Sequence, residues 1–93
     1  MMYATKIKMK PGCGKSNNVL EIDKIYITGA KEEKFYPKEN VHNAVKKEPG
    51  CIKVNKSPNY PDLIPAVSPA KEKYVRSEPN DTENDNLLKL PRE

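Results

Sequence analysis

The chain has 93 residues, of which 35% are hydrophobic and 32% charged, and its formal net charge is +4. This length corresponds to one small domain and excludes a large catalytic cleft or a two-domain enzyme. No apolar run approaches the roughly 20 residues that a bilayer-spanning helix needs, which excludes a helical membrane protein. We therefore expect a single domain over residues 1–93 and no membrane among its partners.

The first two predicted elements are strands joined by a polar loop. Residues 3–10 alternate between two faces, one with Tyr3, Thr5, Ile7 and Met9 and the other with Ala4 and three lysines. A period of two is typical of a half-buried strand. Residues 19–28 form the second strand, which is rich in Ile. Its alternation changes phase at Lys24, so either both faces are partly covered or a β-bulge shifts the phase.

Residues 37–47 are predicted to form the only helix. The segment begins with a proline, which suits the first helical position, and its acidic first turn and basic last turn complement the helix dipole. A stripe of Val41, Ala44 and Val45 is expected to pack against the sheet. His42 lies off this stripe, so we expect it on the helix surface.

Three further strands are possible after the helix. Residues 51–55 are expected to form a short strand with Ile52 and Val54 facing inward, and residues 73–77 a final strand with Val75 inward. Between them lies a proline-rich connection over 57–69, in which 63–68 can form an edge strand. Residues 78–93 comprise an acidic, asparagine-rich loop followed by an apolar anchor of Leu87, Leu88 and Leu90.

The predicted order of elements is β-β-α-β-β-β. Hairpin-linked strands around one helix indicate a single α+β domain with a mostly antiparallel sheet and one short helix packed on one face. We expect one sheet to contain four of the strands, which are residues 3–10, 19–28, 51–55 and 73–77.

The two cysteines are expected to lie in a reducing compartment. Lysines within residues 6–10 interrupt any apolar segment near the start, so the sequence shows no signal peptide and we expect the cytoplasm. Cys13 and Cys51 could form a disulfide only with their Cα atoms within about 7 Å. Together with His42 they supply three candidate ligands and no Cys-x-x-Cys spacing, whereas a structural zinc needs four, so we expect neither a metal nor a cofactor.

The segment from Met9 to Ser16 ends in Gly-Lys-Ser, as a phosphate-binding P-loop does. That loop requires a glycine where Met9 stands and a helix that opens at Ser16. A strand-like run follows instead, so we expect a hairpin loop and no nucleotide hydrolysis. No side chains in the sequence form a recognisable catalytic set.

Lysines recur at every second position of the first strand. Lys6, Lys8 and Lys10 are spaced about 6.6–6.8 Å apart along one face. With Lys15 close by in the sequence and Tyr3 available for stacking, this row could follow the phosphates of a nucleic acid. Alternatively, charged lysines on an exposed strand suppress edge-to-edge aggregation.

Arg76 lies on the last predicted strand, before the acidic loop. A guanidinium binds a carboxylate bidentately, so we expect Arg76 to anchor residues 78–86 through Asp85 or through the carbonyl groups of that turn. A competing interpretation makes Arg76 an anion-binding residue in an open site.

The end of the chain resembles a known family. Tyr-Val-Arg-Ser at 74–77, Asp-Asn-Leu at 85–87 and Leu-Pro at 90–91 are similar to the closing motif of small prokaryotic proteins catalogued as domain of unknown function three-eight-nine-two. The resemblance implies an α+β fold and no assigned activity, and it transfers no catalytic residues. The segment 57–69 is more proline-rich than the family pattern.

Together these observations predict a non-enzymatic cytoplasmic protein that binds another macromolecule, in the first place a protein, as a monomer or weak dimer. The alternative is a nucleic-acid-binding module that uses the N-terminal lysine strand.

Overall fold

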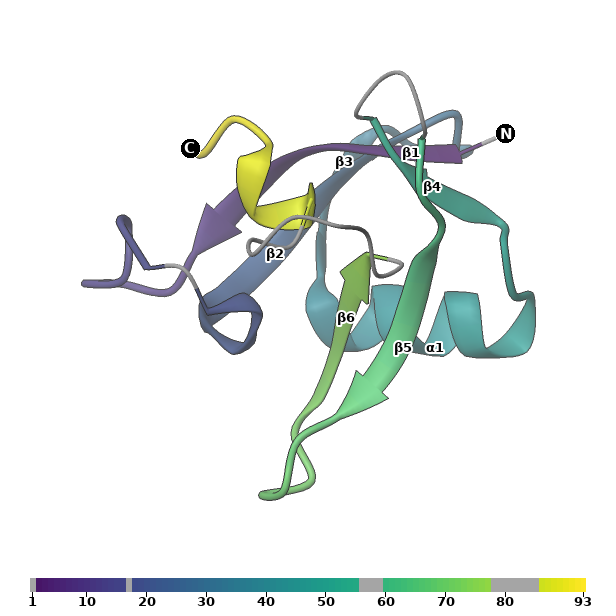
Figure 1. Cartoon of the computed structure of the whole chain (residues 1–93). Coiled ribbons are helices and arrows are strands. Elements are labelled where there is room, and N and C mark those ends of the chain that lie inside the picture. The colour runs from purple at the N-terminus through teal and green to yellow at the C-terminus, as the bar shows by residue number, and fades with distance from the viewer. Residues whose placement is uncertain (1, 17, 56–59, 78–85) are drawn as a thin grey trace.

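The computed structural model describes residues 2–16, 18–55, 60–77 and 86–93 (Figure 1). These residues form a single α+β domain, as predicted. Its elements are β1 (Met2–Met9), β2 (Ile22–Thr28), β3 (Lys34–Pro37), α1 (Lys38–Lys47), β4 (Ile52–Val54), β5 (Leu63–Val67) and β6 (Lys73–Ser77), with 3-10 turns at Val19–Glu21 and Asn86–Lys89.

The strands form two sheets rather than the one expected. The larger sheet has the order β3-β2-β1-β4, in which only the β1–β4 pairing is parallel. The prediction that residues 73–77 join this sheet is wrong, because β6 pairs with β5 in a separate antiparallel hairpin. The edge strand proposed at 63–68 is present as β5, and its partner is β6.

The strand β3 was not predicted. Its four residues are too few for an alternating pattern to emerge, and it forms because β2 offers an antiparallel partner. Pro37 ends β3 and serves as the N-cap of α1, so the helix begins at Lys38, one residue later than expected. Pro37 has no N–H to donate, which suits this junction.

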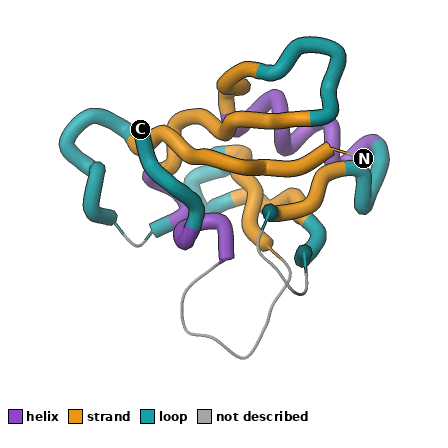
Figure 2. Tube along the Cα trace, turned by 90° about the horizontal axis from the view of Figure 1, so that it is seen from above, coloured by secondary structure: helices purple, strands orange, loops and turns teal. Residues whose placement is uncertain are grey.

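α1 and the β5–β6 hairpin lie on the same side of the four-stranded sheet (Figure 1). The core fills the space between these two elements and the sheet. Its buried side chains are Ala4, Ile7, Met9, Ile22, Ile25, Ile27, Val41, Val45, Ile52, Val54, Leu63, Val75, Leu87, Leu88 and Leu90. The predicted leucine anchor is thus confirmed. Figure 2 looks onto the other side of the sheet, where no described helix or strand covers it. We call this side the open face.

A β-bulge in β1 changes which side chains point inward. The pairing with β2 shifts between Ala4 and Lys6, so β1 carries one extra residue there. Ala4 and Ile7 therefore both face the core although they are three residues apart. The prediction that Tyr3 and Thr5 share the buried face with Ile7 is wrong, since both are only partly buried.

A second bulge lies in β2. The pairing with β1 skips Asp23, so Ile22 and Ile25 both face the core. This confirms the bulge alternative for the change of phase at Lys24. The same bulge places Lys24 opposite Lys8, and both side chains point away from the core on the open face.

The buried face of α1 differs from the predicted stripe. Val41 and Val45 are buried as expected, but Ala44 is exposed. Lys38 and His42 are buried instead, each with 2% of its surface exposed. The prediction that His42 lies on the helix surface is therefore wrong. The reason is the β5–β6 hairpin, which packs on this flank of the helix and replaces water there.

Candidate functional site

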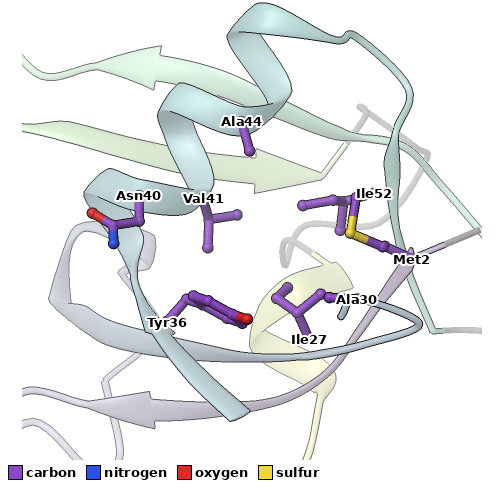
Figure 3. A pocket seen from close by; sticks show the side chains of 8 residues that line it. All are labelled: Met2, Ile27, Ala30, Tyr36, Asn40, Val41, Ala44 and Ile52. Carbon is purple, nitrogen blue, oxygen red and sulfur yellow. The ribbon is translucent and has the colours of Figure 1, made fainter. Parts of the chain in front are cut away.

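An apolar pocket opens between α1 and the inner side of the four-stranded sheet (Figure 3). Its volume is about 310 Å³. The lining side chains come from β1, β2, β3, β4, α1 and the turn after β2, and they are Met2, Ile27, Ala30, Tyr36, Asn40, Val41, Ala44 and Ile52. We call this the helix–sheet pocket.

The helix–sheet pocket has a buried floor and an accessible rim. Ile27, Val41 and Ile52 are each at most 3% exposed and form the floor, whereas Asn40 and Ala44 on the rim are exposed. Its polar groups are few. The Tyr36 hydroxyl already donates to the carbonyl oxygen of Glu32 at 2.6 Å, which leaves the Asn40 amide at the edge. Such a site can bury an apolar group.

The predicted lysine row is divided by the fold. Lys6 and Lys8 remain on the open face, but Lys10 turns toward Glu72 and Lys15 is exposed in the loop after β1. Lys6 forms an ion pair with Glu93 at 3.1 Å. The four lysines expected to act together therefore lie in three different environments.

The open face gains residues that sequence reasoning missed. Tyr26 and Phe35 stand beside Lys6 on neighbouring strands, and Lys24 stands beside Lys8. The strand register reveals these neighbours, because β2 and β3 are separated from β1 along the chain. Placing the bulge in β2 is the one sequence signal that could have aligned Lys24 with Lys8.

Three charged groups meet at the first residue of α1. The Lys38 ammonium is buried and donates to the carbonyl oxygen of Leu20 at 2.7 Å and to the Glu72 carboxylate. Lys10 donates to the same carboxylate at 3.1 Å. Hydrogen bonds from Lys38 and then Lys10 lower the pKa of Glu72, and the bond to Glu72 raises the pKa of Lys10. This cluster ties the β5–β6 turn to the helix and to the end of β1.

The Gly-Lys-Ser segment is a hairpin loop built around an acidic group. The thiol of Cys13 and the hydroxyl of Ser16 both donate to the Glu21 carboxylate, at 2.7 and 2.6 Å. These bonds lower the pKa of Glu21, and the bond to Glu21 raises that of Cys13. A three-residue 3-10 turn takes the place of the helix that a P-loop needs. A carboxylate in this position repels phosphate.

The family model for DUF3892, described as a protein of unknown function, matches residues 4–91. The chain belongs to the DUF3892 family. The resemblance of its last residues is thereby confirmed, and it extends over nearly the whole domain. No curated protein and no solved structure matches this DUF3892 chain. The family carries no activity to transfer, so its sites rest on their own geometry.

Several predicted features of the DUF3892 chain concern ligands or partners. Cys13 and Cys51 are both free thiols. Within the part of the chain that the structure describes, no group of three or more His, Cys, Asp or Glu side chains could hold a metal ion. No helix among the same residues is long and apolar enough to cross a membrane.

Arg76 lies in β6, paired with Ile64 of β5, and is half-buried. Asp85 and most of the 78–86 loop lie outside the described residues. The anchor between Arg76 and that loop therefore stays a prediction.

Lys15→Ala is expected to change the free energy of unfolding by no more than about 0.5 kcal/mol, because Lys15 is an exposed loop residue. Thermal denaturation followed by circular dichroism measures this change. We also expect ATP to cause no saturable amide shift at Gly14 or Ser16 in the native protein, since the Glu21 carboxylate already accepts hydrogen bonds from Cys13 and Ser16 in this loop. A saturable shift at those amides would contradict the interpretation of this loop.

Proposed function

We propose that this DUF3892 protein is a non-enzymatic binding module whose helix–sheet pocket receives an apolar side chain of a partner protein. The observation that supports the proposal is the pocket of about 310 Å³ with apolar walls from both layers of the domain. Burying one large apolar side chain stabilises a complex by roughly 1.5–3 kcal/mol. That contribution is enough for a hot spot in a small interface.

A peptide side chain suits the pocket better than a small metabolite. Pockets for small molecules usually span about 300–1,000 Å³ and contain several convergent polar groups. This pocket is at the lower end of that range and offers mainly the Asn40 amide. Asn40 and Ala44 lie on the exposed surface of α1, where a partner backbone can run past them.

The proposal also places the protein in the cytoplasm. Cys13 and Cys51 are partly accessible free thiols, which persist in a reducing compartment and tend to be oxidised outside it. Monomer or weak dimer remains the state in which we expect it to act.

Ala44→Phe is expected to weaken peptide binding by filling the pocket from its rim. Peptides of about 12 residues would be selected against the native protein by phage display, and their affinities measured by fluorescence anisotropy. The selected peptides should share a bulky apolar residue, and Ala44→Phe should weaken their binding by at least about tenfold.

Asn43→Phe is the matched control. Asn43 is exposed and does not line the pocket, so the added ring should leave the affinity unchanged. Equal loss in both variants, or selected peptides that bind Ala44→Phe as tightly as the native protein, would contradict the proposal. Circular dichroism confirms that both variants are folded.

A further inference from the structure

The open face of the four-stranded sheet presents aromatic rings and lysines in adjacent rows. One row crosses three strands as Lys6, Tyr26 and Phe35. The next row is Lys8 with Lys24. All five side chains are at least partly accessible. Figure 2 shows no described helix or strand over this side of the sheet. This surface is separate from the helix–sheet pocket, which lies on the inner side of the sheet.

The two rings of the first row are held in place by their neighbours. Tyr26 and Phe35 meet edge to face, with ring centroids 5.1 Å apart and planes at 84°. The Tyr26 hydroxyl donates to the carbonyl oxygen of Glu33 at 3.0 Å, which fixes its orientation. The Lys6 ammonium lies 5.3 Å from the centre of the Tyr26 ring. A fixed aromatic surface loses little conformational entropy when a flat group stacks on it.

The two lysines of the second row repel each other. Lys8 and Lys24 are direct cross-strand neighbours, and like charges in that arrangement destabilise a sheet. Neither side chain forms an ion pair with a described residue. An anion that bridges the two ammonium groups would remove the repulsion. The free protein therefore has two ammonium groups beside the aromatic surface, and an anionic partner would neutralise their repulsion.

We propose that the open face binds single-stranded nucleic acid, with bases stacked on Tyr26 or Phe35 and phosphates held by Lys8 and Lys24. Unstacked bases need an aromatic platform, and their backbone needs cations at its side. The face provides both on adjacent strands. A duplex keeps its bases paired and cannot use the rings. An acidic peptide could use the lysines but has no bases to stack.

Two acidic side chains near the open face, Glu93 and Asp23, weaken its attraction for an anionic strand. Lys6 and its partner Glu93 are both about half exposed, at 43% and 53% of their side-chain surfaces, so this ion pair is weak and can yield to a phosphate. Asp23 follows Ile22 at the bulge and is next to Lys24 in sequence. Removing the charge of Glu93 should therefore strengthen binding of an anionic strand.

The test measures the affinity of the full chain for a fluorescein-labelled oligothymidylate of about 12 nucleotides by anisotropy, over a range of salt concentrations. We expect binding that weakens as salt rises. The double variant Lys8→Gln/Lys24→Gln should bind at least about tenfold more weakly, and the slope of log affinity against log salt should fall by about 1.4. Phe35→Leu should cost about tenfold in affinity with little change of slope. Glu93→Gln should bind more tightly.

Lys46→Gln/Lys47→Gln is the matched control, because it removes the same charge from the exposed side of α1. The control should bind as the native protein does. The Lys8/Lys24 variant relieves a repulsion, so its melting temperature should not fall. The proposal is overturned if the oligonucleotide does not bind at low salt, or if the control loses as much affinity as the strand variant. It is equally overturned if a duplex of the same length, or a polyglutamate peptide as competitor, binds as tightly.

Discussion

Val45→Asp is expected to unfold the domain. Val45 is fully buried in the last turn of α1, between the four-stranded sheet and the β5–β6 hairpin. A carboxylate there would be removed from water among apolar side chains, and such a group costs several kcal/mol. The stability of a whole domain is typically about 5–15 kcal/mol, and a chain of this size is at the lower end. The cost of the buried carboxylate is therefore most of the free energy of unfolding of the domain.

Asn43→Asp adds the same charge two residues away on the exposed side of α1. It should change the free energy of unfolding by no more than about 0.5 kcal/mol. Urea denaturation followed by circular dichroism distinguishes the two variants. A cooperative transition in Val45→Asp at the native midpoint would show that α1 does not pack as described.

Glu72→Gln is expected to destabilise the domain by roughly 2–4 kcal/mol, because it leaves the buried Lys38 ammonium without an anionic partner. Lys38→Met removes the cation and keeps the long apolar stem. Replacing a buried charge by an apolar side chain often leaves stability unchanged, so we expect this variant to lose much less stability than Glu72→Gln. The double variant Lys38→Met/Glu72→Gln should be more stable than the sum of the single losses implies.

The Glu72 carboxylate also makes the stability of the domain fall at low pH. Hydrogen bonds from Lys38 and Lys10 lower the pKa of Glu72 in the folded state below its ordinary value of 4.5. The unfolded chain then binds the proton first as pH falls, so the contribution of Glu72 is fully present above pH 4.5 and is lost as pH drops through the folded pKa.

Below pH 4.5 the melting temperature of the native protein should therefore fall more steeply than that of Glu72→Gln. Thermal denaturation at several pH values measures the two slopes. Parallel slopes, together with an unchanged melting temperature at neutral pH, would show that the Lys38–Glu72 contact contributes nothing.

The features of the fold that depend on local pattern were predictable. The alternation in residues 3–10, the apolar stripe at Val41 and Val45 and the three leucines after residue 86 each identify a buried segment from its own neighbours. The helix boundaries follow from Pro37 and from Pro49-Gly50 in the same way. In each case, a few adjacent residues contain the whole signal, since the periods of a strand and a helix are short.

Tertiary structure decided which of these elements meet and which faces they cover. Nothing near β6 in the sequence shows that it pairs with β5 rather than with the larger sheet, because pairing depends on chain segments brought together only in the fold. Lys38 and His42 read as surface residues on an isolated helix, yet the β5–β6 hairpin buries both. The β2 bulge aligns Lys24 with Lys8 across two strands. Both candidate surfaces depend on such long-range contacts: the helix–sheet pocket on the packing of α1 over the sheet, and the open face on the register of β1, β2 and β3.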